Sequence, residues 1–209
     1  MARRTKEEAL ATRDRILDAA EHVFQQRGVS QTSLHDIASV AGVTRGAIYW
    51  HFRDKADLFN AMMQRATLPM EEAAIATDSS ATEDPIEHLR RSFMDVLHKV
   101  VNDPQVRRVF EIATHKVEYV GELQAVRDRH LATRNECLAH VQRGLLQAMR
   151  RGELSARLPA RSAALGLHAL IDGLIQNWML DPRAFDLVKV GRQVLDGYLA
   201  GLVRDDVPA

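Results

Sequence analysis

Residues 33–52, with the sequence SLHDIASVAGVTRGAIYWHF, constrain the fold more than any other stretch of the chain. Ser33 and Asp36 have the spacing of a capping box, which starts a helix because each side chain satisfies a backbone N–H of the other residue. Gly42 suits the left-handed conformation that ends a helix, and Thr44 is suited to cap a second one. We therefore predict two short helices joined by a tight glycine turn, which is the arrangement of a helix-turn-helix.

The second of these helices, residues 45–51, has an unusual surface. Ile48 and Phe52 are one turn apart and can face a core, whereas the other side chains are mostly polar donors. Gly46 lowers helix stability, so its presence favours a close approach at that point. The major groove of DNA accepts such a helix, with the N-terminal residues near the base edges. A solvated helix-loop-helix in an all-helical protein is the alternative.

Two longer runs around this motif, TRDRILDAAEHVFQQRGV (12–29) and GVTRGAIYWHFRDKADLF (42–59), resemble the TetR family of bacterial repressors. The opening ARRTKEEALATR, together with GVTRGAIYWHF, is most similar to the AcrR branch, whose members repress multidrug efflux operons. This specific similarity covers about the first quarter of the chain. Beyond it the resemblance rests on length, helical pattern and short stretches such as EIATHK and IDGLI.

Charge and composition narrow the classes of function. The chain has 28 basic and 28 acidic side chains, and residues 1–55 hold nine basic against seven acidic ones. DNA binding would thus depend on where the charges lie.

The single cysteine excludes an internal disulfide, and no apolar run approaches the roughly 18 residues that span a bilayer. We expect a cytoplasmic protein, nucleoid-associated when bound to DNA. We found no catalytic motif and no metal-ligand spacing, and therefore predict no enzyme activity and no cofactor.

Strand-like alternation is almost absent, so the predicted class is all-α, with a helix-turn-helix domain at 1–54 and a ligand-binding and dimerisation domain at 55–209. Arg3, Arg4 and Lys6 form either a DNA-contacting arm or a frayed terminus. The first predicted helix covers residues 8–27, and after the two short helices a connector helix covers 55–77. A linker follows at 78–84. The remaining predicted helices are 85–102, one from about 106 to near 121, a long one from there to 151, 160–180 and about 188–202.

The last two predicted helices are apolar on more than one face, and the last repeats apolar residues at intervals of three and four. One face can be buried in the domain and the other against a second molecule. The family resemblance implies a homodimer with a four-helix interface, whereas an ordinary core helix pair is the alternative. The predicted interface residues are Leu167, Leu174, Trp178, Val188, Leu195, Tyr198 and Leu202.

Several polar side chains lie among apolar positions of the predicted C-terminal helices. His168 and Asp172 are one turn apart, and a buried carboxylate needs a partner or a cationic ligand. They form either an internal pair or part of a ligand chamber. Cys137 is expected to be a buried small residue. The resemblance implies a drug pocket with walls at Phe93, Val96, Phe110, Thr114, Cys137, Val141, His168 and Asp172.

The combined prediction is a homodimeric repressor that binds an inverted-repeat operator and is released by small lipophilic drugs, controlling a multidrug efflux operon. A regulator of a metabolic operon that responds to a specific metabolite is the alternative, and an architectural DNA-binding protein or an enzyme are further classes. Arg45 is the predicted base contact. Trp50 either contacts the DNA backbone or packs into the domain. The remaining predicted DNA-binding residues are Ser33, Thr44, Gly46, Tyr49, His51 and Lys55.

Overall fold

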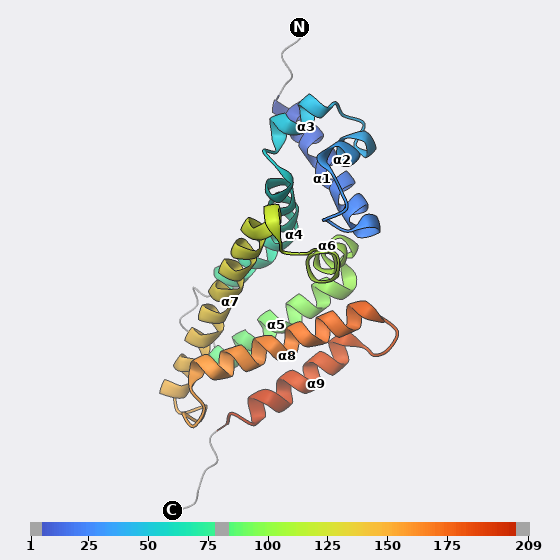
Figure 1. Cartoon of the computed structure of the whole chain (residues 1–209). Coiled ribbons are helices and arrows are strands. Elements are labelled where there is room, and N and C mark those ends of the chain that lie inside the picture. The colour runs from blue at the N-terminus through green and yellow to red at the C-terminus, as the bar shows by residue number, and fades with distance from the viewer. Residues whose placement is uncertain (1–5, 78–83, 204–209) are drawn as a thin grey trace, which may run out of the picture. The chain divides into compact units, whose positions relative to one another are not determined.

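The computed structural model describes residues 6–77 and 84–203, with side chains described as far as residue 67 in the first range (Figure 1). These residues form helices and no strand, with one isolated antiparallel bridge between Leu154 and Val203. The all-α class is therefore confirmed. In chain order the helices are α1 (Lys6–Arg27), α2 (Leu34–Val40), α3 (Arg45–His51), α4 (Lys55–Thr77), α5 (Pro85–Asn102), α6 (Pro104–His115), the 3-10 helix η1 (Gly121–Leu123), α7 (Gln124–Arg150), α8 (Ala160–Leu180) and α9 (Leu187–Ala200).

The chain divides into two compact units, and neither is continuous in sequence. Unit 1 consists of Met1–Pro69 and Arg108–His130, and unit 2 consists of Met70–Arg107 and Leu131–Ala209. Helices α4, α6 and α7 each run from one unit into the other. Arg3, Arg4 and most of the predicted linker at 78–84 lie outside the described residues.

The helix-turn-helix of unit 1 forms as its capping residues predict. Ser33 Oγ accepts the N–H of Asp36, whose carboxylate accepts the N–H of Ser33 at 2.9 Å. At the other end of α2, Gly42 has φ +64°, and the N–H of Val43 reaches back to the Ala38 carbonyl at 3.0 Å. Only glycine adopts this left-handed backbone without strain, which fixes the turn into α3.

The core of unit 1 brings α1, α2, α3 and the start of α4 together. Helix α1 packs against both α2 and α3. The side chains that close this core are large and almost fully buried: Ile16, Leu17, Phe24, Ile37, Ile48, Phe52, Leu58, Phe59 and Met62. Because Ile48 and Phe52 anchor one side of α3, the opposite side of that helix faces solvent.

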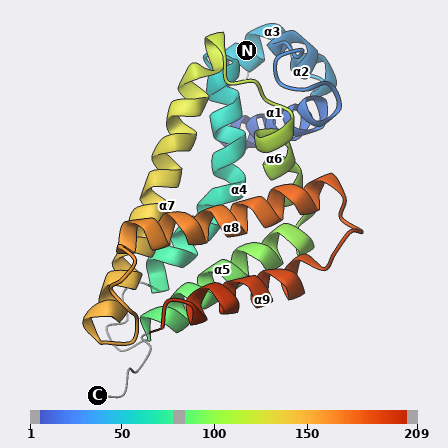
Figure 2. The same ribbon diagram turned by 60° about the horizontal axis from the view of Figure 1, so that its bottom comes forward.

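In unit 2, α9 packs against both α5 and α8, and the three helices lie side by side in both ribbon views (Figures 1 and 2). Helix α5 begins as predicted, with Asp84 accepting the N–H of Ile86 and Pro85 in the first turn. The close contact between α8 and α9 depends on Gly166, because a Cβ there would overlap the Tyr198 hydroxyl.

The main difference from the predicted helix boundaries lies after α6. The predicted helix ran to about Gly121, but α6 ends at His115. The backbone turns away because the Lys116 carbonyl accepts the N–H of Val29 at 2.8 Å, and the Tyr119 hydroxyl donates to the Ala113 carbonyl at 2.8 Å. Across the described residues, no helix combines the length and apolar character that crossing a membrane requires.

Candidate nucleic-acid interface

One side of helix α3 is exposed and has little role in packing unit 1. Thr44 caps it by accepting the N–H of Ala47 at 3.1 Å. Arg45, Gly46 and Tyr49 are exposed, and His51 is half-buried. A Cβ at Gly46 would meet nothing closer than the Thr44 hydroxyl at 3.9 Å, so packing within the chain does not require glycine there.

Two aromatic contacts shape this surface. The Arg45 guanidinium carbon lies 5.7 Å from the centroid of the Tyr49 ring, within the range of a cation–π interaction. The rings of Trp50 and His51 meet edge to face at 4.5 Å. Trp50 is 72% exposed, which excludes the possibility that it packs into the domain. The reason is its register, because Ile48 and Phe52 occupy the buried side of α3 and Trp50 lies between them in sequence.

Lys55, a predicted DNA-binding residue, is not exposed on this surface. It is only 8% exposed, and its Nζ donates to the Thr32 carbonyl at 3.0 Å and pairs with Glu122 Oε1 at 2.8 Å. The sequence could not reveal this pairing, because Glu122 is far away in the chain. In the conformation described here, the Lys55 ammonium is already engaged. Ser33 is also engaged, as the cap of α2.

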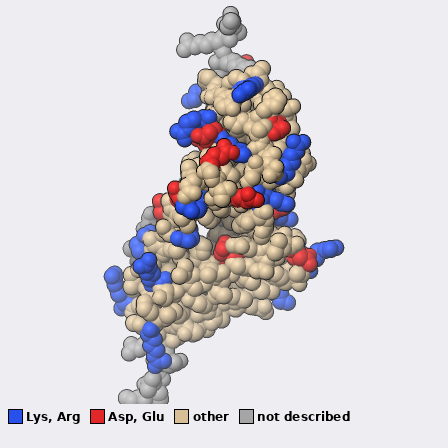
Figure 3. Space-filling model, in the orientation of Figure 1, with Lys and Arg blue, Asp and Glu red and all other residues tan. Residues whose placement is uncertain are grey.

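The surface of unit 1 carries both signs of charge. On the face shown in Figure 3, blue and red groups are interspersed over this unit. Within this unit, the buried Glu21 carboxylate of α1 contacts Arg65 of α4 and, at 3.4 Å, Arg108 of α6. Arg65 also pairs with Asp18 at 2.8 Å. These pairs join α1 to the helices that lead out of the unit.

The predicted pocket residues are divided between the two units. Phe110 and Thr114 belong to unit 1 and the other six to unit 2. Thr114 donates to the Phe110 carbonyl at 2.7 Å, and Asp172 accepts from Gln176 at 2.6 Å. In unit 2, Phe93 and Val141 are buried, whereas Val96, His168 and Asp172 are half-buried.

The predicted burial of Cys137 is wrong, since it is exposed on α7 in a run of exposed residues at 132–137. Apolar neighbours in sequence do not share a side of a helix, which is why composition misplaced this residue. In the ranges that the structure describes, no group of three or more His, Cys, Asp and Glu side chains is placed to hold a metal ion.

Four of the predicted dimer-interface residues lie in the core of the single chain. Leu167, Trp178, Leu195 and Leu202 are between 0% and 7% exposed, so they have almost no surface left for a second molecule. The repeat of three and four instead packs α9 against α5 and α8. Leu174, Val188 and Tyr198 are half-buried.

The sequence reasoning missed the apolar side chains that do face outward from α8. Leu165 and Leu180 are 55% and 71% exposed, and Leu170 is also exposed. The sequence did indicate exposed apolar residues on α8, because this helix is apolar around most of its circumference. Choosing which side faces the domain required the positions of α5 and α9.

A helix-turn-helix whose second helix exposes an arginine, a tyrosine and a tryptophan is typical of proteins that bind DNA in the major groove. Residues 16–62 match the model of bacterial regulatory proteins of the tetR family, and residues 84–203 match that of the C-terminal region of MAATS-type transcriptional repressors. The chain belongs to the TetR family, whose members are transcriptional regulators and not enzymes.

Individual relatives cover nearly the whole chain. The chain is 42% identical over 195 residues to the transcriptional regulator AcrR of Shigella flexneri, covering 92% of this chain and 89% of the relative. NalD, the secondary repressor of the MexAB-OprM multidrug efflux pump in Pseudomonas aeruginosa, is 36% identical with a TM-score of 0.87, covering 94% and 99%. SmeT in its complex with triclosan is 32% identical with a TM-score of 0.83, covering 95% of each chain.

Proposed function

We propose that this chain is a repressor that binds an inverted-repeat operator as a homodimer through α3. The observation that carries this proposal is the exposed face of α3, where Arg45, Gly46, Tyr49 and Trp50 have little role in packing the unit. An arginine can donate two hydrogen bonds to a guanine edge, and a glycine beside it lets the backbone approach the groove. Such a protein works in the cytoplasm, at the nucleoid when DNA is bound.

The test of DNA reading is fluorescence anisotropy with fragments from the DNA upstream of the chain's own gene and its neighbours. Arg45→Ala should weaken operator binding about 5- to 150-fold, the loss expected for one bidentate base contact. Arg161→Ala is the matched control, because Arg161 is an exposed arginine of α8 in the other unit. Equal effects of the two changes, or the absence of any preferred fragment, would refute the proposal.

For the dimer, the supporting observation is the set of apolar side chains that a single chain leaves exposed on α8, Leu165, Leu170 and Leu180. A helix that leaves several large apolar side chains exposed is a candidate interaction surface. Leu180→Glu should shift the mass measured by light scattering after gel filtration from dimer to monomer. Leu10→Glu, at an exposed leucine of α1, should leave the mass unchanged. A monomeric wild-type chain would contradict the assignment.

We further propose that small lipophilic compounds release the operator and that the target is a multidrug efflux operon. The related SmeT binds triclosan, and NalD represses an efflux pump. Within unit 2, the candidate ligand contacts are Phe93, Val96, Val141, His168 and Asp172, which combine apolar walls with a few polar groups. Phe110, Thr114 and Cys137 stay predictions from the resemblance alone.

Ligand binding can be followed by the fluorescence of Trp178 in a Trp50→Phe background, since the chain has two tryptophans. Triclosan serves as the probe. Asp172→Ala and Phe93→Ala should each weaken its binding, whereas Asp95→Ala, at an exposed aspartate of α5, should not. Unchanged affinity in both unit 2 variants would remove these residues from the site. An operator affinity that triclosan leaves unchanged would count against triclosan as an inducer.

A further inference from the structure

The Lys55 ammonium lies between the start of the helix-turn-helix and a distant segment of the chain. Lys55 is the first residue of α4, and its Nζ donates to the carbonyl of Thr32, the residue directly before the Ser33 cap of α2. The same Nζ lies 2.8 Å from Glu122 Oε1. One basic group therefore joins α4 to η1 and to the residue before the α2 cap.

Glu122 reaches this position because its segment is docked on the same unit. We call residues 116–123 the α6–α7 connection. Its first carbonyl, on Lys116, accepts the N–H of Val29 at 2.8 Å, and a Cβ on Gly28 would lie 3.4 Å from that carbonyl. The side chain of Glu122 is nevertheless 60% exposed, against 9% for that of Lys55. The ion pair thus joins a buried ammonium to a largely exposed carboxylate.

A solvent-exposed carboxylate and a DNA phosphate offer a lysine the same chemistry, namely anionic oxygens that accept N–H donors. A lysine ammonium has three donors, and the bond to the Thr32 carbonyl uses one. The N-terminus of α4 also favours an anion through the helix dipole. The Lys55 ammonium is buried and needs an anionic partner, whereas the Glu122 carboxylate is largely exposed. A phosphate can therefore replace the carboxylate without leaving the ammonium unpaired.

We propose that Glu122 acts as an internal substitute for an operator phosphate: it holds Lys55 in the free protein and leaves when a phosphate binds. Glu122 then lowers operator affinity, and it does so through Lys55. This inference rests on the proposed DNA-binding function. It makes Glu122 a positioning residue of the DNA-binding unit, although it lies outside the helix-turn-helix.

The experiment measures operator affinity by fluorescence anisotropy at several salt concentrations. Glu122→Gln should tighten binding about two- to five-fold, the size expected for releasing an ion pair whose carboxylate is largely exposed. Lys55→Gln should reduce the slope of log K against log salt by about 0.9, as one lost phosphate contact does. In the Lys55→Gln background, Glu122→Gln should give no further tightening beyond its matched control.

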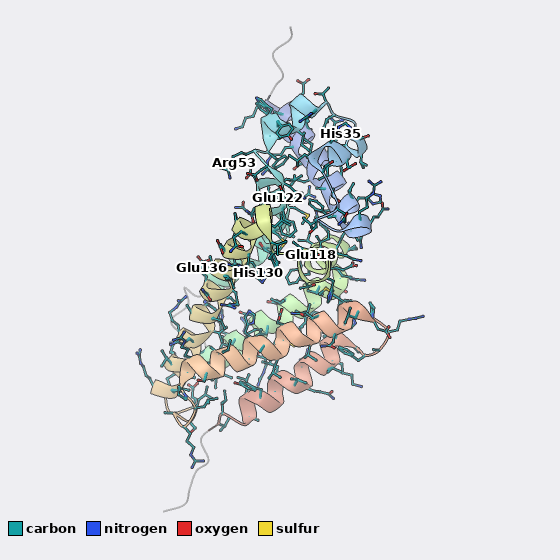
Figure 4. The ribbon with its side chains drawn as sticks, in the orientation of Figure 1. His35, Arg53, Glu118, Glu122, His130 and Glu136 are labelled. Carbon is teal, nitrogen blue, oxygen red and sulfur yellow. The ribbon has the colours of Figure 1, made fainter. Side chains whose placement is uncertain are left out.

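The matched control is Glu118→Gln. Glu118 lies exposed on the same connection, and Figure 4 labels both glutamates there. Glu118→Gln reports the general effect of removing one negative charge near DNA. If Glu122→Gln tightens operator binding no more than Glu118→Gln does, the proposal is overturned. Weaker binding by Glu122→Gln also overturns it, because that result indicates a purely structural pair. If Lys55→Gln does not fold, the two glutamate variants still decide. If the wild-type chain selects no DNA fragment, the proposed function fails instead.

Discussion

Arg45 and Tyr49 lie one turn apart on α3, with the guanidinium carbon 5.7 Å from the centroid of the aromatic ring. Stacking on a ring leaves the N–H edge of a guanidinium free to donate, which is the edge that reads guanine. The contact is worth about 0.5–1 kcal/mol at an exposed site. We therefore expect Tyr49 to orient Arg45 for the proposed base contact.

Replacing the ring should therefore relax specificity. Tyr49→Leu should reduce the preference for operator over a variant with one changed base pair by about two- to five-fold, the equivalent of one exposed cation–π contact. Tyr49→Phe keeps the ring and should keep this ratio, even if loss of the hydroxyl weakens all sequences alike. Competition anisotropy gives the ratio. Equal loss of preference in both variants would assign the role to the hydroxyl.

The buried Glu21 carboxylate should contribute to stability far more than its neighbour Asp18. Glu21 contacts both Arg65 and Arg108, whereas the Asp18 side chain is 67% exposed and contacts the same Arg65. Glu21→Gln should lower the free energy of unfolding by about 1–3 kcal/mol, because it leaves two arginines without their shared partner. Asp18→Asn should cost less than about 1 kcal/mol. Urea unfolding distinguishes them, and equal losses would contradict a special role for the buried group.

Asp103, between α5 and α6, should make stability depend on pH. Burial alone would raise the pKa of its carboxyl, but the N–H groups of Val106 and Gln105 and the Lys99 ammonium outweigh burial and hold the pKa below its usual value. A lowered folded pKa gives stability that is complete above the unfolded value of about 3.9 and lost as pH falls through the folded value.

Asp103→Asn keeps the hydrogen-bonding shape but removes the charge. It should therefore be less stable than wild type at pH 7, by at most about 1 kcal/mol. The difference should shrink towards pH 3, where the wild-type carboxylate begins to take up its proton. Thermal unfolding at both pH values tests this. A difference that is the same at both would show that the charge has no part in it.

The contact between Gly166 and Tyr198 should make α8 sensitive to a larger side chain at position 166. The Tyr198 hydroxyl donates to the Ala163 carbonyl at 2.9 Å, and a Cβ on Gly166 would overlap that hydroxyl. Gly166→Ala should cost about 1–3 kcal/mol, as overpacking does, despite the better helix propensity of alanine. In a Tyr198→Phe background the same change should cost less. Additive losses in the double variant would mean that the hydroxyl is not the obstacle.

Local signals in the sequence were enough to predict the helix-turn-helix. The Ser33–Asp36 box, Gly42 and Thr44 specify α2, the turn and α3 through bonds that span no more than five residues. The starts of α4 and α5 and the bounds of α8 follow from capping and helix-breaking residues in the same way. Such interactions are readable because both partners lie within one or two turns of each other.

Tertiary structure alone decided which apolar residues lie in the core and which charged side chains form ion pairs. Leu167 and Leu165 look alike in sequence, yet one is buried and the other 55% exposed, because the positions of α5 and α9 choose the buried side of α8. Lys55 looked free until the fold brought Glu122 to it across 66 intervening residues. The sequence by itself determined the DNA-reading helix and its family. The partners of its surrounding charges depend on contacts that no local pattern encodes.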